Sequence, residues 1–161
     1  MNNLIHRGCL LPHNVSTGPL GSVFHYADRR WACPLHLVTY QKLEKYLQEL
    51  GNTRQIDLGV DLHKITQTTS GKDLLVLERK IPNPKHWEVL RYRLLLHATL
   101  LKLTQKPAVA EVLQKLPTGP IYSLAGGQVW GVQLKDNTFV GENLNGKILQ
   151  ELRPILRHIY A

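Results

Sequence analysis

The sequence WGVQLKDNTFVGENLNGKILQELRPILR, residues 130–157, contains the pattern that decides the fold of this chain. An apolar run ends at Trp130–Gly131, a polar turn follows, and two glycines and two asparagines within residues 141–146 precede an amphipathic segment. Apolar residues recur in that segment every three or four positions, which predicts a last helix with one buried face. Pro154 removes a helical hydrogen bond and predicts a kink there.

The turn before this helix has features of an anion-binding loop. Gly141 and Gly146 allow the backbone to approach a ligand closely or to adopt positive φ. The first amides of a helix are unpaired donors and its dipole favours negative charge, so the turn is a candidate phosphate site. Asn143 is expected either to cap the helix or to contact the ligand, and a capped helix start without a ligand remains the alternative.

Further helices are predicted upstream. Residues 35–50 place apolar side chains on one stripe, and Gly51–Asn52 supply a stop. A second helix is predicted to open at Pro82–Pro84 and to continue through residues 86–105 as the central core helix. A third is expected over residues 107–116, after a proline that tolerates the first turn.

Extended segments are predicted to be few and short. Residues 73–79 fit a short strand or an irregular apolar run, and residues 66–71 fit a loop. Residues 121–125 and 128–134 fit two strands joined by a turn at Gly126–Gly127. The chain is therefore predicted to form one helix-rich α+β domain over residues 1–161, with a small antiparallel sheet.

Length and composition favour a cytoplasmic protein with an anionic partner. The apolar runs of the 161 residues are shorter than the roughly 20 residues that span a bilayer, so no membrane association is expected. Residues 1–14 lack the layout of a secretory signal, and Cys9 and Cys33 are expected to be free thiols in a reducing cytoplasm. The net charge of +8 favours an anionic ligand, with an acidic protein or nucleic acid as the weaker alternative. The histidine spacing predicts no metal site, and no cofactor is expected.

The motifs of residues 31–157 resemble those of the NADAR or YbiA-like family. That family has a carboxy-terminal pattern of W-G followed by G-x-N-x-L-G-x-x-L-M-x-x-R, and its W-P-x-x-E-H-x-x-Q-A-x-K motif is similar to WACPLHLVTYQK of residues 31–42. Trp87 and Thr118–Gly119 fall where the family has a D-W and a T-G pair. The remaining matched positions are Trp31, His36, Lys42, Trp130, Gly131, Gly141, Asn143, Gly146, Leu149 and Arg153.

The resemblance implies an N-glycosidase that cleaves the bond between ribose C1 and a base or amine. It also implies carboxylates at the positions of Leu35, His86 and Gly127, none of which is acidic here. Such a reaction needs a carboxylate to stabilise an oxocarbenium-like centre or to activate water. The usual active site of the family is therefore not carried over, and enzymatic activity is left open.

Other side chains are candidates to replace these carboxylates. Each carries an ionisable group, and each has a surface or structural role as its alternative. The candidates are Asp28, His36, Glu44, Glu78, His86 and Glu142.

Tryptophans and basic residues complete the predicted ligand site. A tryptophan face can stack on a base, and Trp130 beside the glycine turn is the favoured ligand-facing aromatic. The resemblance places Trp31 in or beside the pocket, whereas core packing is preferred for Trp87. The basic side chains considered for phosphate contacts are Lys42, Arg79, Lys85, Arg91 and Arg153.

Three functions remain open at this point. The leading one is a NADAR-like domain that binds ADP-ribose, a nucleotide or a ribose phosphate with a degenerate glycosidase site. The second is an active N-glycosidase on ADP-ribosylated or riboflavin-pathway intermediates that uses relocated acids. The third is a protein-interaction module that retains only the scaffold. The absence of acids at Leu35 and Gly127 distinguishes the degenerate site from the active one. The intact turn of residues 141–146 counts against the third function.

Overall fold

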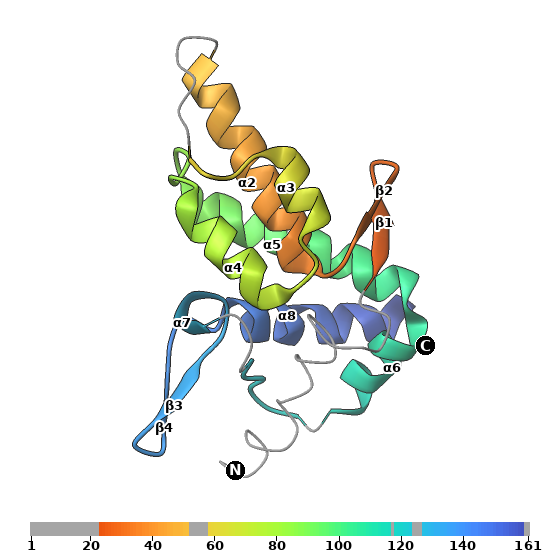
Figure 1. Cartoon of the computed structure of the whole chain (residues 1–161). Coiled ribbons are helices and arrows are strands. Elements are labelled where there is room, and N and C mark those ends of the chain that lie inside the picture. The colour runs from red at the N-terminus through yellow and green to blue at the C-terminus, as the bar shows by residue number, and fades with distance from the viewer. Residues whose placement is uncertain (1–22, 52–57, 117, 124–126, 160–161) are drawn as a thin grey trace.

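The structure, a computed structural model of the chain, describes residues 23–51, 58–116, 118–123 and 127–159. Helices predominate in these residues, and four short strands form two separate antiparallel hairpins (Figure 1). This confirms the helix-rich α+β class, with two small sheets in place of the single one expected. Cys9, Asn52 and residues 124–126 of the expected strand and turn lie outside the described residues.

Two long helices form the centre of the molecule. α2 (Pro34–Leu50) packs against α5 (Trp87–Gln105), and the short helices α3 (Leu62–Gln67) and α4 (Gly71–Lys80) cover another side of α2 (Figure 1). Pro34 starts α2, and Gly51, with a φ of 64°, ends it as expected. No helix in the described residues is both long and apolar enough to cross a bilayer.

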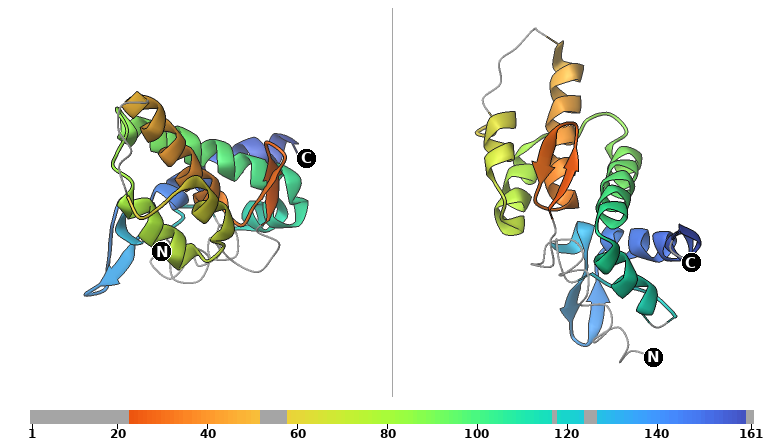
Figure 2. Two further views of the ribbon diagram at one scale, coloured as in Figure 1. Left: turned by 45° about the horizontal axis from the view of Figure 1, so that its top comes forward. Right: turned by 90° about the vertical axis from the view of Figure 1, so that its right-hand side faces the viewer.

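The carboxy-terminal helices pack against α5 and against each other. α6 (Pro107–Lys115) and α8 (Leu144–Ile159) contact each other and α5. Figure 2 shows α2, α3 and α4 grouped toward one end of the molecule and α6, α7 (Gly127–Trp130) and α8 toward the other. α8 continues through Pro154, whose ring lies on the exposed side, and the predicted last helix is confirmed.

The expectation of a strand or irregular run at residues 73–79 was wrong, because these residues lie in α4. Leu74, Leu77 and Glu78 share the buried face of α4, which is helical spacing. Ser70 caps the helix by accepting a hydrogen bond from the amide of Asp73. So few residues do not distinguish a helical period from a strand period in the sequence.

The central helix begins later than expected. α5 starts at Trp87 rather than at Pro82–Pro84, because His86 has a φ of 58° and lies in the left-handed region. Helical geometry therefore cannot extend upstream through His86.

The expected pairing of residues 121–125 with 128–134 was also wrong. Residues 127–130 form α7, and β3 (Gln133–Lys135) pairs instead with β4 (Thr138–Val140). The turn between them, Asp136–Asn137, has positive φ at both residues, which is typical of a type I′ hairpin turn.

A second hairpin was not expected from the sequence. It pairs β1 (Phe24–Tyr26) with β2 (Arg29–Trp31), and its turn at Ala27–Asp28 also has positive φ at both residues. The two hairpins lie on opposite sides of the molecule (Figure 1).

One buried charge in the core has no partner among the described residues. Lys102 of α5 is fully buried, and its Nζ makes no hydrogen bond there. Burial lowers the pKa of Lys102 from 10.5 to about 8, opposed by the nearby Cys33 and assisted by the charge of Lys106. Cys33 is itself a buried, free thiol, and burial raises its pKa, so it lacks the character of a nucleophile.

We predict that Lys102→Met stabilises the protein. The unfolded chain binds the Lys102 proton more tightly than the folded one, so the free energy of unfolding at pH 7 should rise by about 3 kcal/mol in the variant. The difference between variant and wild type should shrink as the pH rises from 8 to 10.5, where the unfolded wild type also loses its proton. Urea denaturation at pH 7 and pH 10 measures both effects, and a less stable variant at pH 7 would contradict the prediction.

Candidate ligand-binding cavity

A cavity of about 490 Å³ lies where α2, α4, α5 and α7 meet. Its volume falls within the range of small-molecule binding sites. Aromatic, basic and amide side chains share its wall, together with one carboxylate. The lining residues are Lys42, Leu75, Glu78, Arg79, Ile81, Asn83, Trp87, Arg91, Gly127, Gln128, Val129, Trp130 and Gln133.

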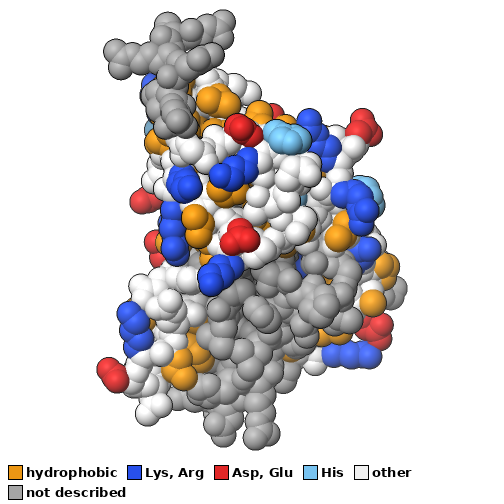
Figure 3. All heavy atoms as spheres, in the orientation of Figure 1, with side chains coloured by type: hydrophobic (Ala, Val, Ile, Leu, Met, Phe, Trp, Pro, Cys, Tyr) orange, Lys and Arg blue, Asp and Glu red, His pale blue; other side chains and the backbone are white. Residues whose placement is uncertain are grey.

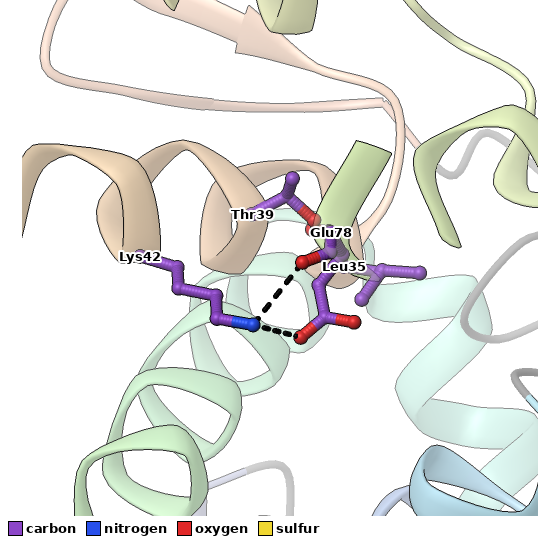
Figure 4. Close-up of polar contacts among 4 residues, drawn as sticks. All are labelled: Leu35, Thr39, Lys42 and Glu78. Carbon is purple, nitrogen blue, oxygen red and sulfur yellow. Dashed lines mark hydrogen bonds and ion pairs between the residues drawn. The ribbon is translucent and has the colours of Figure 1, made fainter. Parts of the chain in front are cut away.

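A buried ion pair forms one wall of this cavity. Lys42 extends from α2 to α4, where its Nζ lies 2.7 Å from Glu78 Oε1 and 3.1 Å from the Glu78 carbonyl oxygen (Figure 4). Both side chains are almost fully buried. Lys42 and Glu78, predicted separately as a ligand contact and a substitute acid, thus act as one unit at the cavity.

Two of the three tryptophans line the cavity. Lys42 Nζ lies 4.9 Å from the ring centroid of Trp87, so one face of that ring is covered by the ammonium group. Trp130, the aromatic favoured from the sequence, reaches the cavity from α7. Trp31 does not line it, because its ring packs in the core against His36 and Tyr40 at centroid distances of 5.2 Å.

Two arginines contribute further positive charge to the wall. Arg79 of α4 is exposed and makes no ion pair within the described residues. Arg91 of α5 is largely buried and donates from Nη2 to Glu142 Oε2 at 2.5 Å. The four charged lining residues, Lys42, Arg79, Arg91 and Glu78, therefore give the cavity wall a net positive charge.

The glycine turn makes its closest contacts with the protein itself. The Asn143 side chain accepts a hydrogen bond from the Ser123 amide at 2.9 Å and donates one to the Ile121 carbonyl at 2.8 Å. A Cβ at Gly146 would lie 2.1 Å from the Ile121 carbonyl oxygen. A Cβ at Gly141 would lie 2.6 Å from the carbonyl oxygen of Gly131, which accepts a hydrogen bond from the Asn143 amide. The contacts of Asn143 and Gly146 hold the segment Ile121–Ser123 against the start of α8, and the Asn143 amide bond to Gly131 holds the end of α7 there.

The remaining candidates from the sequence lie away from the cavity lining. His36 is buried, with Nδ1 accepting from the Ala32 amide and Nε2 within 2.7 Å of the Ile65 carbonyl oxygen, and burial lowers its pKa. Arg153 donates from Nη2 to the Gly119 carbonyl oxygen at 3.1 Å. Asp28 is an exposed turn residue of the first hairpin.

Glu44 lies on α2, half-buried, outside the lining of the cavity. Sequence reasoning missed three polar lining residues, Asn83, Gln128 and Gln133. The one sequence feature that could have identified them is that each lies a few residues from Trp87 or Trp130.

A second cavity, of about 460 Å³, lies between α3 and α4. Its lining includes Lys64, Ser70, Asp73 and Lys80 but no aromatic side chain. Over the described part of the chain, no three His, Cys, Asp or Glu side chains group as metal ligands would. On the face shown in Figure 3, Lys and Arg side chains are interspersed with apolar, acidic and uncharged atoms rather than joined in one patch. The first cavity is therefore the better candidate for an organic anion.

Comparison with known proteins adds no family assignment. No family model matches this sequence, and no curated protein matches it.

We predict that Gly146→Ala destabilises the protein. Alanine is favoured over glycine inside a helix by about 1 kcal/mol, but the added Cβ would press on the Ile121 carbonyl oxygen. We expect the clash to prevail and to lower the free energy of unfolding by about 2 kcal/mol. Urea denaturation measures this loss. An unchanged or higher stability of Gly146→Ala would show that the contact is not close.

Proposed function

We propose that this protein binds an anionic nucleotide or ribose-phosphate ligand, such as ADP-ribose, in the cavity between α2, α4, α5 and α7. The observation that carries the proposal is the lining itself, which combines two tryptophans with three basic side chains against one carboxylate. Aromatic faces stack on bases, and guanidinium groups match the oxygens of phosphate. This combination suits a ligand with a planar ring at one end and phosphate at the other.

The resemblance to the NADAR or YbiA-like family supports the same ligand class. Lys42, Trp87 and Trp130 are matched positions far apart in the sequence, and all three line this one cavity. Gly127, where the family has its second acid, also lies in the lining. The glycine turn contributes indirectly, because it positions α7 rather than lining the cavity.

We further propose that the protein acts in the reducing cytoplasm. The free, buried thiol of Cys33 supports this, because disulfides are rare in that compartment.

Glu78 favours a second candidate function, N-glycosidase activity. Leu35, where the family has its first acid, lies on the same face of α2 as Lys42, since the two are about two helical turns apart. Glu78 of α4 supplies a carboxylate to that face through its contact with Lys42. It would stabilise a positively charged ribosyl centre or accept a proton from water, which are the roles that a relocated acid must fill.

For the binding function, we predict that ADP-ribose binds the wild-type protein and that Arg79→Gln weakens this binding about fivefold or more. Arg79 is the lining cation without an ion pair in the described residues, so its charge is available to a phosphate. Isothermal titration calorimetry measures the affinity. Lys80→Gln is the matched control. It removes a positive charge from the next residue of α4, which lines the second cavity instead of the first. The absence of binding to ADP-ribose, AMP and ribose 5-phosphate would refute the proposed function.

For the catalytic function, we predict that Glu78→Gln abolishes any release of base or amine from ADP-ribosyl substrates. Glutamine keeps the shape of the side chain but carries no charge and accepts no proton at neutral pH. Chromatography of the reaction products measures the rate, and ADP-ribose titration shows whether the variant still has its binding site. Glu88→Gln, an exposed change at the start of α5, is the control. Wild-type turnover that survives Glu78→Gln would exclude Glu78 as the acid.

A further inference from the structure

We propose that Arg91 anchors a phosphate group in the cavity and that Glu142 is an internal anion, which the phosphate displaces from Arg91. This inference deepens the function proposed above and rests on it, because it assumes that the cavity is the ligand site.

Arg91 has an unused donor beside a used one. Its Nη2 holds the Glu142 carboxylate at 2.5 Å, but its Nε is buried without a hydrogen-bond partner among the described residues. A buried donor left unsatisfied is costly and calls for an explanation. In a guanidinium group Nε and Nη2 share one edge, which matches two oxygens of a phosphate. A phosphate in the cavity would therefore satisfy the Nε donor that Glu142 leaves unpaired.

Glu142 can release Arg91 without a change in the fold. Its side chain is 49% exposed, whereas that of Arg91 is 15% exposed, so the carboxylate can turn into water while the guanidinium group stays in the wall. The backbone of Glu142 is held separately, because its amide donates to the Gln128 carbonyl oxygen at 2.6 Å. Ion pairs with a solvent-exposed partner contribute little to stability, which makes this contact displaceable.

The charge of Glu142 opposes the ligand. A phosphate on Arg91 would bring a second anion close to the Glu142 carboxylate, and like charges at short range repel each other. Glu142 therefore lowers the affinity of the cavity for phosphate and selects for ligands with enough negative charge to displace it. The opposite role, in which Glu142 orients Arg91 for the ligand, predicts the opposite effect of its removal.

The test measures pyrophosphate binding by calorimetry to the full chain and its variants. We expect Glu142→Gln to tighten binding roughly threefold to fivefold, because the variant no longer has a carboxylate that competes with the phosphate for Arg91. The size of this effect corresponds to one solvent-exposed ion pair. Arg91→Gln should weaken binding at least about tenfold, and the double variant should bind no better than Arg91→Gln alone. Glu111→Gln is the matched control, because it removes a carboxylate from the exposed Glu111–Lys115 pair on α6 and should leave the affinity unchanged.

Folding is checked by thermal unfolding of each variant. Should Arg91→Gln fail to fold, Arg91→Lys replaces it, since it keeps the charge but loses the paired donors and should still weaken binding.

The outcomes separate this inference from the proposed function. Weaker or unchanged pyrophosphate binding by Glu142→Gln would overturn the displacement model, and ADP-ribose binding by the wild type would still support the proposed ligand site. Tighter pyrophosphate binding by Glu142→Gln without binding of ADP-ribose, AMP or ribose 5-phosphate would support the phosphate anchor and refute the proposed ligand class. The absence of pyrophosphate binding to both wild type and Glu142→Gln would overturn the inference.

Discussion

The ion pair between Lys42 and Glu78 joins the core of the protein to its cavity. Lys42 Nζ contacts the carboxylate and carbonyl oxygens of Glu78 on α4 and lies over the ring of Trp87 on α5. Removing two charges from water is expensive, so only close pairing with further contacts makes the arrangement tolerable. A protein with two apolar side chains in place of such an ion pair is often equally stable. Stability therefore gives little explanation for the presence of this pair. Its position in the cavity wall supports a role in ligand binding or chemistry instead.

Two side-chain amides each bind a backbone segment of another part of the chain through a pair of hydrogen bonds. Asn143 donates to and accepts from the segment Ile121–Ser123, and Gln105 does the same with the backbone of His25 at 2.7 Å in both directions. Each amide thereby replaces the pair of bonds that a neighbouring strand would make. The backbone amides of Glu142 and Asn143 in turn donate to the carbonyl oxygens of Gln128 and Gly131, so the same turn also holds α7 and its Trp130.

The sequence predicted the helices that are long or that have a clear glycine or proline at an end. Residues 35–50 and the last helix repeat their apolar positions over several turns, and both were located correctly. α4 was missed because its buried residues span little more than one turn, and the first hairpin because Ala27–Asp28 is not a typical type I′ sequence. Lys42, Glu78 and Trp130 were named from sequence, but only tertiary packing brings them together. The buried pairing of Lys42 with Glu78 depends on how α4 docks on α2, which neither segment encodes by itself.

The charges around the cavity are mostly paired within the protein. The net charge of +8 favours the approach of any anion, because a positive surface raises the rate of encounter. Inside the cavity, however, Lys42 is already paired with Glu78, and Arg91 is already paired with Glu142. Arg79 has no such pair in the described residues, so an incoming anion meets it without displacing a carboxylate. Under the proposed displacement of Glu142, a ligand with a single weak charge would gain only the contact with Arg79, whereas a phosphate would also compete for Arg91.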